Sequence, residues 1–159
     1  MRAAVLTVSD RVSRGEAADG SGDTLAELLA ADGYAVSRRV VPDEAEEIAA
    51  AIEELAAEAA VVLTTGGTGV APRDVTPEAT RSVIERDVPG IAEALRAGSI
   101  AKTPHGLLSR GVAGVRGRTL VVNLPGSTGG CRDGYAMLRP ALGHALSLLR
   151  DEPTHHEQT

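Results

Sequence analysis

Aromatic side chains are almost absent from this chain. It contains no Phe and no Trp, and Tyr34 and Tyr135 are its only aromatic residues. Since 43 % of the 159 residues are nevertheless hydrophobic, the chain has enough apolar material for one α/β domain with a well-buried core. We therefore expect the core to consist of Val, Leu, Ile and Ala side chains.

Cysteine and long apolar runs are scarce as well. Cys131 is the only cysteine, which excludes an internal disulfide and a cysteine-based zinc site and is typical of a reducing compartment. The segment 1–7 lacks the apolar centre of a signal peptide. No apolar run approaches the roughly 20 residues that a membrane-spanning helix needs. We expect a cytoplasmic protein that does not enter a membrane.

Basic charge is also in short supply. The chain has 16 Lys and Arg residues against 22 Asp and Glu residues, which gives a formal net charge of −6. Nucleic-acid-binding proteins normally carry a basic surface stripe, so this balance argues against a nucleic-acid partner. An anionic small ligand stays compatible with it, because the local field of a pocket can oppose the net charge.

Strands and helices alternate along the first half of the sequence, and this pattern predicts parallel strands joined by right-handed crossovers. The expected strands are 3–9, 34–41, 61–65 and 119–124. The expected helices run from about Leu25 to a stop at Gly33, after Pro42, from Thr76, over 91–97 and over 133–150, with Pro140 either kinking the last helix or marking its true start. Residues 107–118 read as irregular or hairpin-like. The sequence predicts one α/β domain over 1–150 and a flexible tail over 151–159.

Two glycine-rich loops follow buried strands. The first contains Thr65, Gly66, Gly67, Thr68 and Gly69, where backbone N–H groups can approach and hold a phosphate. A tight turn explains the same glycines equally well. The loop 65–69 is not a Walker A loop, because no Gly-Lys-Ser/Thr sequence follows it.

The second loop contains Asn123, Pro125, Gly126 and Ser127 and leads into a helix. A helix N-terminus favours anions, although a plain strand-to-helix connection is the simpler interpretation. In parallel sheets ligands bind beyond the carboxyl ends of the strands. Both loops should therefore open on the same edge, and Ser9 and Asp10 close the first strand there too.

Two acids lie just beyond predicted strand ends. Asp43 and Asp74 at one sheet edge are suited to hold Mg²⁺ beside phosphates. The spacing from Asp43 to Glu46 also resembles a capping box, and spacing alone favours a helix cap for Asp43. For Asp74 a solvent-facing loop acid is the alternative, and the spacing does not decide. Arg110 can pair with a phosphate bidentately, although a lone arginine in a loop is usually solvated.

In combination, these segments resemble the molybdopterin-binding MoaB/Mog family. The matching stretches occur in the family's order and cover nearly the whole chain: residues 7–11, 19–22, 65–69, 72–80, 108–110 and 123–127. The stretch from Thr65 to Thr80, which includes Pro-Arg-Asp-Val-Thr-Pro, is the most specific.

The resemblance implies a three-layer α/β fold with a mostly parallel central sheet, assembled as a homotrimer or as a hexamer. It implies an enzyme that uses Mg²⁺ and ATP to adenylylate the terminal phosphate of molybdopterin with release of pyrophosphate. A molybdate-insertion enzyme is an implied partner. By the same resemblance Asp43 and Asp74 are essential and hold the metal, so Asp43 becomes more than a cap. Ser109 and Asn123 fall in the pterin and phosphate pocket, and residues 66–69 lie against the nucleotide or the pterin phosphate.

Position 128 departs from the family pattern. Many adenylylating members have Pro-Gly-Ser-Pro or Pro-Gly-Asn-Pro, whereas this chain has Thr128 after Ser127. Threonine at this position also occurs in MoaB-type paralogues that lack the transferase activity. The alternative function is therefore an inactive paralogue that binds molybdopterin as a carrier or assembly factor. A different nucleotide-acting enzyme and a purely structural oligomer are the remaining alternatives.

Overall fold

The computed structural model describes residues 1–152. The predicted tail falls mostly on residues 153–159, which lie outside that range, and the domain limits stay a prediction. The elements in chain order are β1 (Arg2–Val8), α1 (Asp10–Ser13), α2 (Gly20–Ala31), β2 (Ala35–Val41), α3 (Ala45–Ala56), β3 (Val61–Thr65), α4 (Thr76–Val83), β4 (Arg86–Asp87), α5 (Pro89–Lys102), the 3₁₀ helix η1 (Pro104–Leu108), β5 (Ala113–Arg116), β6 (Thr119–Leu124) and α6 (Thr128–Leu149).

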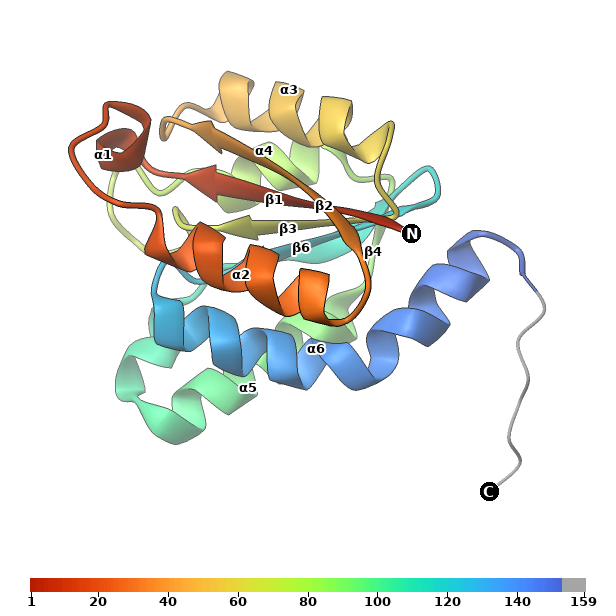
Figure 1. Cartoon of the computed structure of the whole chain (residues 1–159). Helices are drawn as coiled ribbons and strands as arrows, with labels where there is room; N and C mark the ends of the chain where they lie inside the picture. Colours follow the sequence, from red (N-terminus) through yellow and green to blue (C-terminus); the bar gives the residue numbers. More distant parts are fainter. Residues whose placement is uncertain (153–159) are drawn as a thin grey trace.

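A six-stranded sheet in the order β2-β1-β3-β6-β5-β4 forms the middle layer. The strands β2, β1, β3 and β6 are parallel, and β5 and β4 continue the sheet in antiparallel pairs. Helices α3 and α4 cover one face, and α2, α5 and α6 cover the other (Figure 1). The predicted three-layer α/β fold with a mostly parallel sheet is confirmed.

The apolar runs of the central strands are continuous because both faces of the sheet are covered. In β1, Ala3 and Val5 pack into the core beneath α2 and α6, whereas Ala4 and Leu6 pack into the core beneath α3. Successive side chains of a strand point to opposite faces. One apolar strand therefore supplies both cores.

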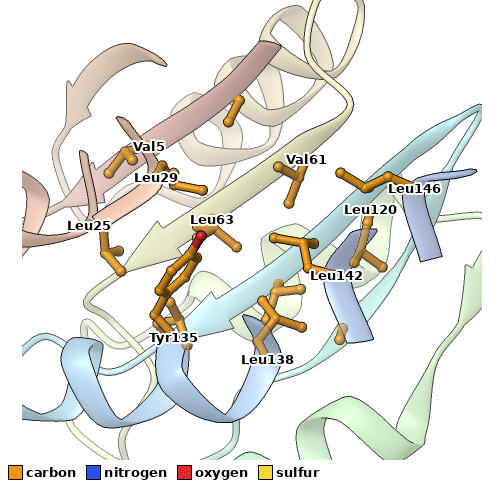
Figure 2. Close-up of a cluster of buried hydrophobic side chains, with 14 of the residues drawn as sticks. Val5, Leu25, Leu29, Val61, Leu63, Leu120, Tyr135, Leu138, Leu142 and Leu146 are labelled. Atoms are coloured by element: carbon orange, nitrogen blue, oxygen red, sulfur yellow. The ribbon is translucent and has the colours of Figure 1, made fainter. Parts of the chain in front are cut away.

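The core contains hardly any aromatic rings, as the composition predicts. Figure 2 shows Leu and Val side chains of α2, α6 and the sheet interdigitating around Tyr135, which is the largest fully buried side chain. Its hydroxyl donates to Asp32 Oδ2 at 2.7 Å. Burying this ring therefore leaves no unpaired hydroxyl.

Helices α6 and α5 have limits that differ from the sequence prediction. Helix α6 begins at Thr128 and not near residue 133, because the Ser127 hydroxyl accepts the Gly130 N–H and caps it. Pro140 lies inside this helix and so does not mark its start. Helix α5 extends beyond the predicted 91–97 on both sides. Among residues 1–152, no helix has the combination of length and apolarity that crossing a membrane requires.

The end of α2 is tied to α6 by one carboxylate. Asp32 accepts the Tyr135 hydroxyl and two bonds from the Arg139 guanidinium, at 2.8 and 2.7 Å. These partners, first the Tyr135 hydroxyl and then Arg139, hold the pKa of Asp32 below its ordinary value of 3.8. The ionised form of Asp32 is therefore favoured in the folded protein.

Replacing Asp32 with Asn should remove a pH-dependent part of the stability. Because the pKa of Asp32 is lowered on folding, its charge stabilises the native state fully above pH 3.8, and this contribution is lost as the pH falls through the folded pKa. The difference in unfolding free energy between wild type and Asp32→Asn should thus shrink from pH 6 to about pH 3. Urea titrations at several pH values measure it. Asp87→Asn, at an exposed position of β4, is the control, and an equal difference at every pH would contradict the prediction.

Candidate active site

The loops that follow the parallel strands meet at one edge of the sheet. In Figure 1 the arrowheads of β1 and β3 point toward the side on which α1 lies. Gly66 donates its N–H to the Leu124 carbonyl at 3.3 Å, and the Thr65 hydroxyl donates to the Pro125 carbonyl at 2.7 Å. A Cβ on Gly126 would lie 3.4 Å from Gly66 Cα. The prediction that the two glycine-rich loops open on the same edge is therefore correct.

The first loop is a tight turn with a backbone conformation that favours glycine. Gly66 and Gly67 have φ angles of +98° and +68°, which residues with a Cβ rarely adopt. The Thr76 hydroxyl donates to the Gly66 carbonyl at 2.9 Å, and the Thr76 N–H donates to the Gly67 carbonyl at 3.1 Å. These bonds fasten the turn to the start of α4. The tight turn, one of the two sequence interpretations, is confirmed, and the phosphate cradle stays a prediction.

Asp43 does not cap α3. Glu44 is the N-cap residue of that helix and makes no side-chain capping bond, so the predicted cap is wrong. Instead, Asp43 Oδ2 accepts the backbone N–H of Asp10 at 2.9 Å, and Asp10 Oδ1 accepts the backbone N–H of Asp43 at 3.0 Å. The carboxylate therefore faces the end of β1.

Asp43 and Asp74 lie on the glycine turn. A Cβ on Gly67 would come within 3.2 Å of Asp43 Oδ1, and one on Gly69 would come within 2.9 Å of Asp74 Oδ2. Burial raises the pKa of Asp43 above 3.8, and the charges of Asp10 and Asp74 raise it further. The site therefore gathers negative charge in partly desolvated surroundings, which a cation would relieve.

The donor set fits Mg²⁺ better than a transition metal. In the described part of the chain no group of three or more His, Cys, Asp or Glu side chains is arranged to hold a metal ion. Mg²⁺ needs only one or two protein carboxylates, because waters and substrate phosphates complete its octahedral shell. Asp43 and Asp74 meet that requirement, and whether they bind the ion stays a prediction.

A cavity of about 940 Å³ lies beside this turn. Its wall combines Thr68 and Gly69 with Ser109, with residues of α5 and η1, and with the first turns of α6. The volume suits a ligand of pterin or nucleotide size. A salt bridge of 2.7 Å between Lys102 of α5 and Asp133 of α6 joins two of the lining residues.

A second hollow, of about 560 Å³, lies at the opposite edge of the sheet, around the start of β1 and the end of α3. It is away from the carboxyl ends of the strands, where ligands bind in parallel sheets.

Several predicted ligand residues also hold the site together. Ser9 caps α1 by accepting the Val12 N–H. The Asn123 side chain donates to the hydroxyls of Thr64 and Thr80 at 3.0 Å each and accepts the Val112 N–H, so its amide is bonded within the core. A role for Asn123 beyond this one stays a prediction.

Arg110 is bonded to the loop rather than to the cavity. Its guanidinium donates to the carbonyls of Gly69 and Asp74, each at 2.7 Å, and pairs with Glu78 of α4. Its backbone N–H donates to the Thr68 carbonyl. Arg110 thus anchors the segment that carries Asp74, and its predicted contact with a phosphate stays untested.

The charged residues at the site that were not proposed from the sequence as functional include Arg73 and Lys102. Arg73 donates from Nε and Nη2 to the Asp10 carboxylate at 2.6 and 3.0 Å, and Nη2 also reaches Glu44 at 3.0 Å. Lys102 lies on the cavity wall. Arg73 lies within the specific stretch from Thr65 to Thr80 and was available to sequence reasoning. Lys102 lies in a segment that showed no motif.

Fold and site together define a class of protein. It is an α/β domain that carries a cavity and two neighbouring carboxylates at the carboxyl ends of its parallel strands. The family model "Probable molybdopterin binding domain" matches residues 4–144. The chain belongs to this family, as the sequence resemblance predicts.

The similarity extends over nearly the whole chain. Gephyrin of Dictyostelium discoideum is 40 % identical over 94 % of this chain and 22 % of its own length. The molybdopterin adenylyltransferase of Helicobacter pylori is 36 % identical over 91 % of this chain and 85 % of its own. The structure of the molybdopterin biosynthesis enzyme MoaB from Thermus thermophilus is 48 % identical with a TM-score of 0.88, and the match covers 96 % of this chain and 98 % of that one. The chain spans half or less of the length of the longer curated relatives that it matches.

Proposed function

We propose that this protein acts in molybdenum cofactor biosynthesis as a molybdopterin adenylyltransferase, which transfers AMP from ATP to the terminal phosphate of molybdopterin. The observation that carries the proposal is the glycine turn 66–69, which has Asp43 and Asp74 beside it and a cavity of about 940 Å³ along it. The family match and the relative named molybdopterin adenylyltransferase support the same reaction.

The chemistry asks the protein for alignment and charge neutralisation. A terminal phosphate oxygen of molybdopterin would attack the α-phosphorus of ATP, forming one P–O bond while the P–O bond to pyrophosphate breaks. This oxygen is already ionised near neutral pH, so no strong general base is needed. The task of the protein is to hold two polyanions in line.

Asp43 and Asp74 would hold the Mg²⁺ ion. When bound, the ion supplies neutralisation of the phosphate charge and stabilises the leaving pyrophosphate. The carboxylates come from two loops, and each carboxylate accepts a backbone N–H. Asp43 is bonded to the Asp10 backbone, and Asp74 Oδ2 accepts the Ala71 N–H at 3.0 Å. Their arrangement therefore exists before any substrate arrives.

The cavity would take the pterin portion. Its wall is mixed, with apolar side chains of Leu95, Leu108 and Met137 and hydroxyls of Ser109 and Ser127. The N-terminus of the 22-residue helix α6 adds backbone N–H groups and a positive helix end, which favour an anion such as the pterin phosphate. Gly69 lines this cavity, and a Cβ on it would come within 2.9 Å of Asp74 Oδ2, so the two substrates would meet at the turn.

Assembly into a trimer or hexamer and contact with a molybdate-insertion enzyme belong to the proposal. The apolar side chains of Ile100, Leu107 and Leu108 are 40–67 % exposed on adjoining elements α5 and η1. Such a patch is suited to contact with another protein surface.

The test is a product assay. Purified protein with molybdopterin, ATP and Mg²⁺ should form adenylylated molybdopterin and pyrophosphate, detected by mass spectrometry, and EDTA should suppress the product. Asp87→Asn, at an exposed position of β4, should match wild type.

Tight molybdopterin binding without product would favour the inactive-paralogue alternative. Thr128 would then be the first residue to exchange. It is the first residue of α6, a position at which proline is well tolerated, so Thr128→Pro introduces the proline of many adenylylating members without breaking the helix. Formation of product by Thr128→Pro would identify position 128 as the cause of the inactivity of the wild type.

A further inference from the structure

Asp10 and Asp43 form a closed ring of hydrogen bonds across two strand ends. Each residue donates its backbone N–H to the carboxylate of the other, at 2.9 and 3.0 Å, although 33 positions separate them in sequence. The ring fixes both the backbone and the carboxylate of Asp43 relative to the end of β1. Any displacement of Asp10 must therefore displace Asp43.

Arg73 holds the other side of the Asp10 carboxylate. Its Nε and Nη2 donate to Asp10 Oδ2 and Oδ1 at 2.6 and 3.0 Å, in the parallel fork that gives guanidinium–carboxylate pairs their geometric specificity. Nη2 also donates to Glu44 at 3.0 Å. Arg73 thus connects the segments that follow β1, β2 and β3.

Asp10 is consequently a poor candidate for direct contact with substrate. Its Oδ1 accepts from both Asp43 and Arg73, and its Oδ2 accepts from Arg73. The guanidinium neutralises its charge, and the side chain is only 22 % exposed. A substrate contact by Asp10 stays a prediction, and the hydrogen bonds give Asp10 a role within the framework of the site.

We propose that Arg73 is a positioning residue, which acts through Asp10 to set where the Asp43 carboxylate lies relative to Asp74. Arg73 is covalently adjacent to Asp74, so its guanidinium links the segment that carries Asp74 to the ring that holds Asp43. This inference rests on the proposed function, since it assumes that Asp43 and Asp74 hold Mg²⁺ beside ATP. Residues that orient metal ligands from behind typically change metal affinity by about 10- to 100-fold when they are removed.

The sign of the effect separates positioning from simple electrostatics. Arg73→Met removes a positive charge near a cation site. If only the charge mattered, the loss of Coulomb repulsion would make Mg²⁺ bind more tightly. Loss of positioning makes Mg²⁺ bind more weakly. A direct contact between Arg73 and an ATP phosphate would instead weaken ATP binding even without metal.

The experiment compares ATP affinity in EDTA with ATP affinity in saturating Mg²⁺, by isothermal titration calorimetry without molybdopterin. For Arg73→Met we expect the ATP affinity in EDTA to stay at the wild-type value. The Mg²⁺ gain, meaning the factor by which saturating Mg²⁺ raises ATP affinity, should fall about 10-fold. Arg73→Lys, which keeps a donor and the charge, should recover part of the gain. Arg39→Met removes a partner of Glu54 in a surface pair between β2 and α3, and it should behave as wild type.

A double-mutant cycle tests the route through Asp10. Asp10→Asn keeps an oxygen for the Asp43 N–H but loses the charge that holds Arg73. If Arg73 acts through Asp10, the double variant should lose no more of the Mg²⁺ gain than the worse single variant, since coupled residues are not additive. Additive losses, or a wild-type gain in Arg73→Met, would overturn the positioning role alone. Absence of any Mg²⁺ gain in wild type would overturn the metal assignment of the proposed function as well.

Discussion

Replacing Asp74 with Asn should leave the protein folded and lower kcat for adenylylation about 10²- to 10³-fold, the usual effect of removing one preorganised electrostatic group. Asparagine has nearly the same shape and keeps an oxygen that can accept the Ala71 N–H, now bonded to Asp74 Oδ2 at 3.0 Å. The backbone bonds of residue 74, to the Ala71 carbonyl and from Arg110, do not involve the side chain. The substitution therefore removes a charge and little else.

The control and the readout follow from this geometry. Asp74 is not among the residues that line the cavity proposed for the pterin. Molybdopterin affinity should therefore change little in Asp74→Asn, and the loss should appear in kcat. Thermal unfolding should give the wild-type Tm. Asp43→Asn should lower kcat to a similar extent, since it also removes a charge. It should stay folded, because its remaining oxygen can still accept the Asp10 N–H. Near-normal turnover in Asp74→Asn would remove the carboxylate from the mechanism.

The first half of the fold was predictable from local signals. Parallel strands buried on both faces give uninterrupted apolar runs, and the glycine at a helix end marks the stop. Gly33, with a φ of +90°, follows the end of α2 where the sequence placed it. Strand β5 and the turn that leads to β6 lie within residues 107–118, the segment that the sequence predicts to be irregular or hairpin-like.

Elements whose limits depend on distant contacts were not predictable. The first turn of α6 contains Gly129 and Gly130, which are poor helix formers. It forms because Ser127 caps it and because Cys131 packs into the core against Thr65 and Pro125. The N-cap of α2 is Asp19, and the Thr7 hydroxyl of β1 donates to its carboxylate.

The site shows the same division. The sequence pointed to the glycine turn and to Asp43 because they closely follow strands, and to Asp74 because it lies in the segment that continues from the turn. It assigned Asp43 a local cap, whereas the structure gives that carboxylate a partner 33 residues away. The bond from Arg73 to Asp10 spans 63 residues. Pairings at this separation are set by the parallel topology, so spacing within one segment could not reveal them.

Gly66→Ala should be among the most destabilising substitutions that add a single methyl group to this site. At a φ of +98° an L-residue is strained by about 1–2 kcal/mol. The added Cβ would also press against the Val8 carbonyl oxygen of the neighbouring strand, and overpacking of this kind costs about 1–3 kcal/mol more. We expect a total loss of about 2–5 kcal/mol in urea unfolding.

Gly15→Ala separates the two causes. Gly15 also has a positive φ, +75°, but a Cβ there meets nothing within 4 Å, so this variant should lose only the strain of about 1–2 kcal/mol. The difference between the two variants then measures the contact between the glycine turn and β1. Because that contact sets how closely the turn approaches the end of β1, Gly66→Ala should also reduce ATP affinity, whereas Gly15→Ala should not. Equal stability losses in both variants would show that the turn can move away from β1, and that the carboxylates beside it are held less firmly than their hydrogen bonds indicate.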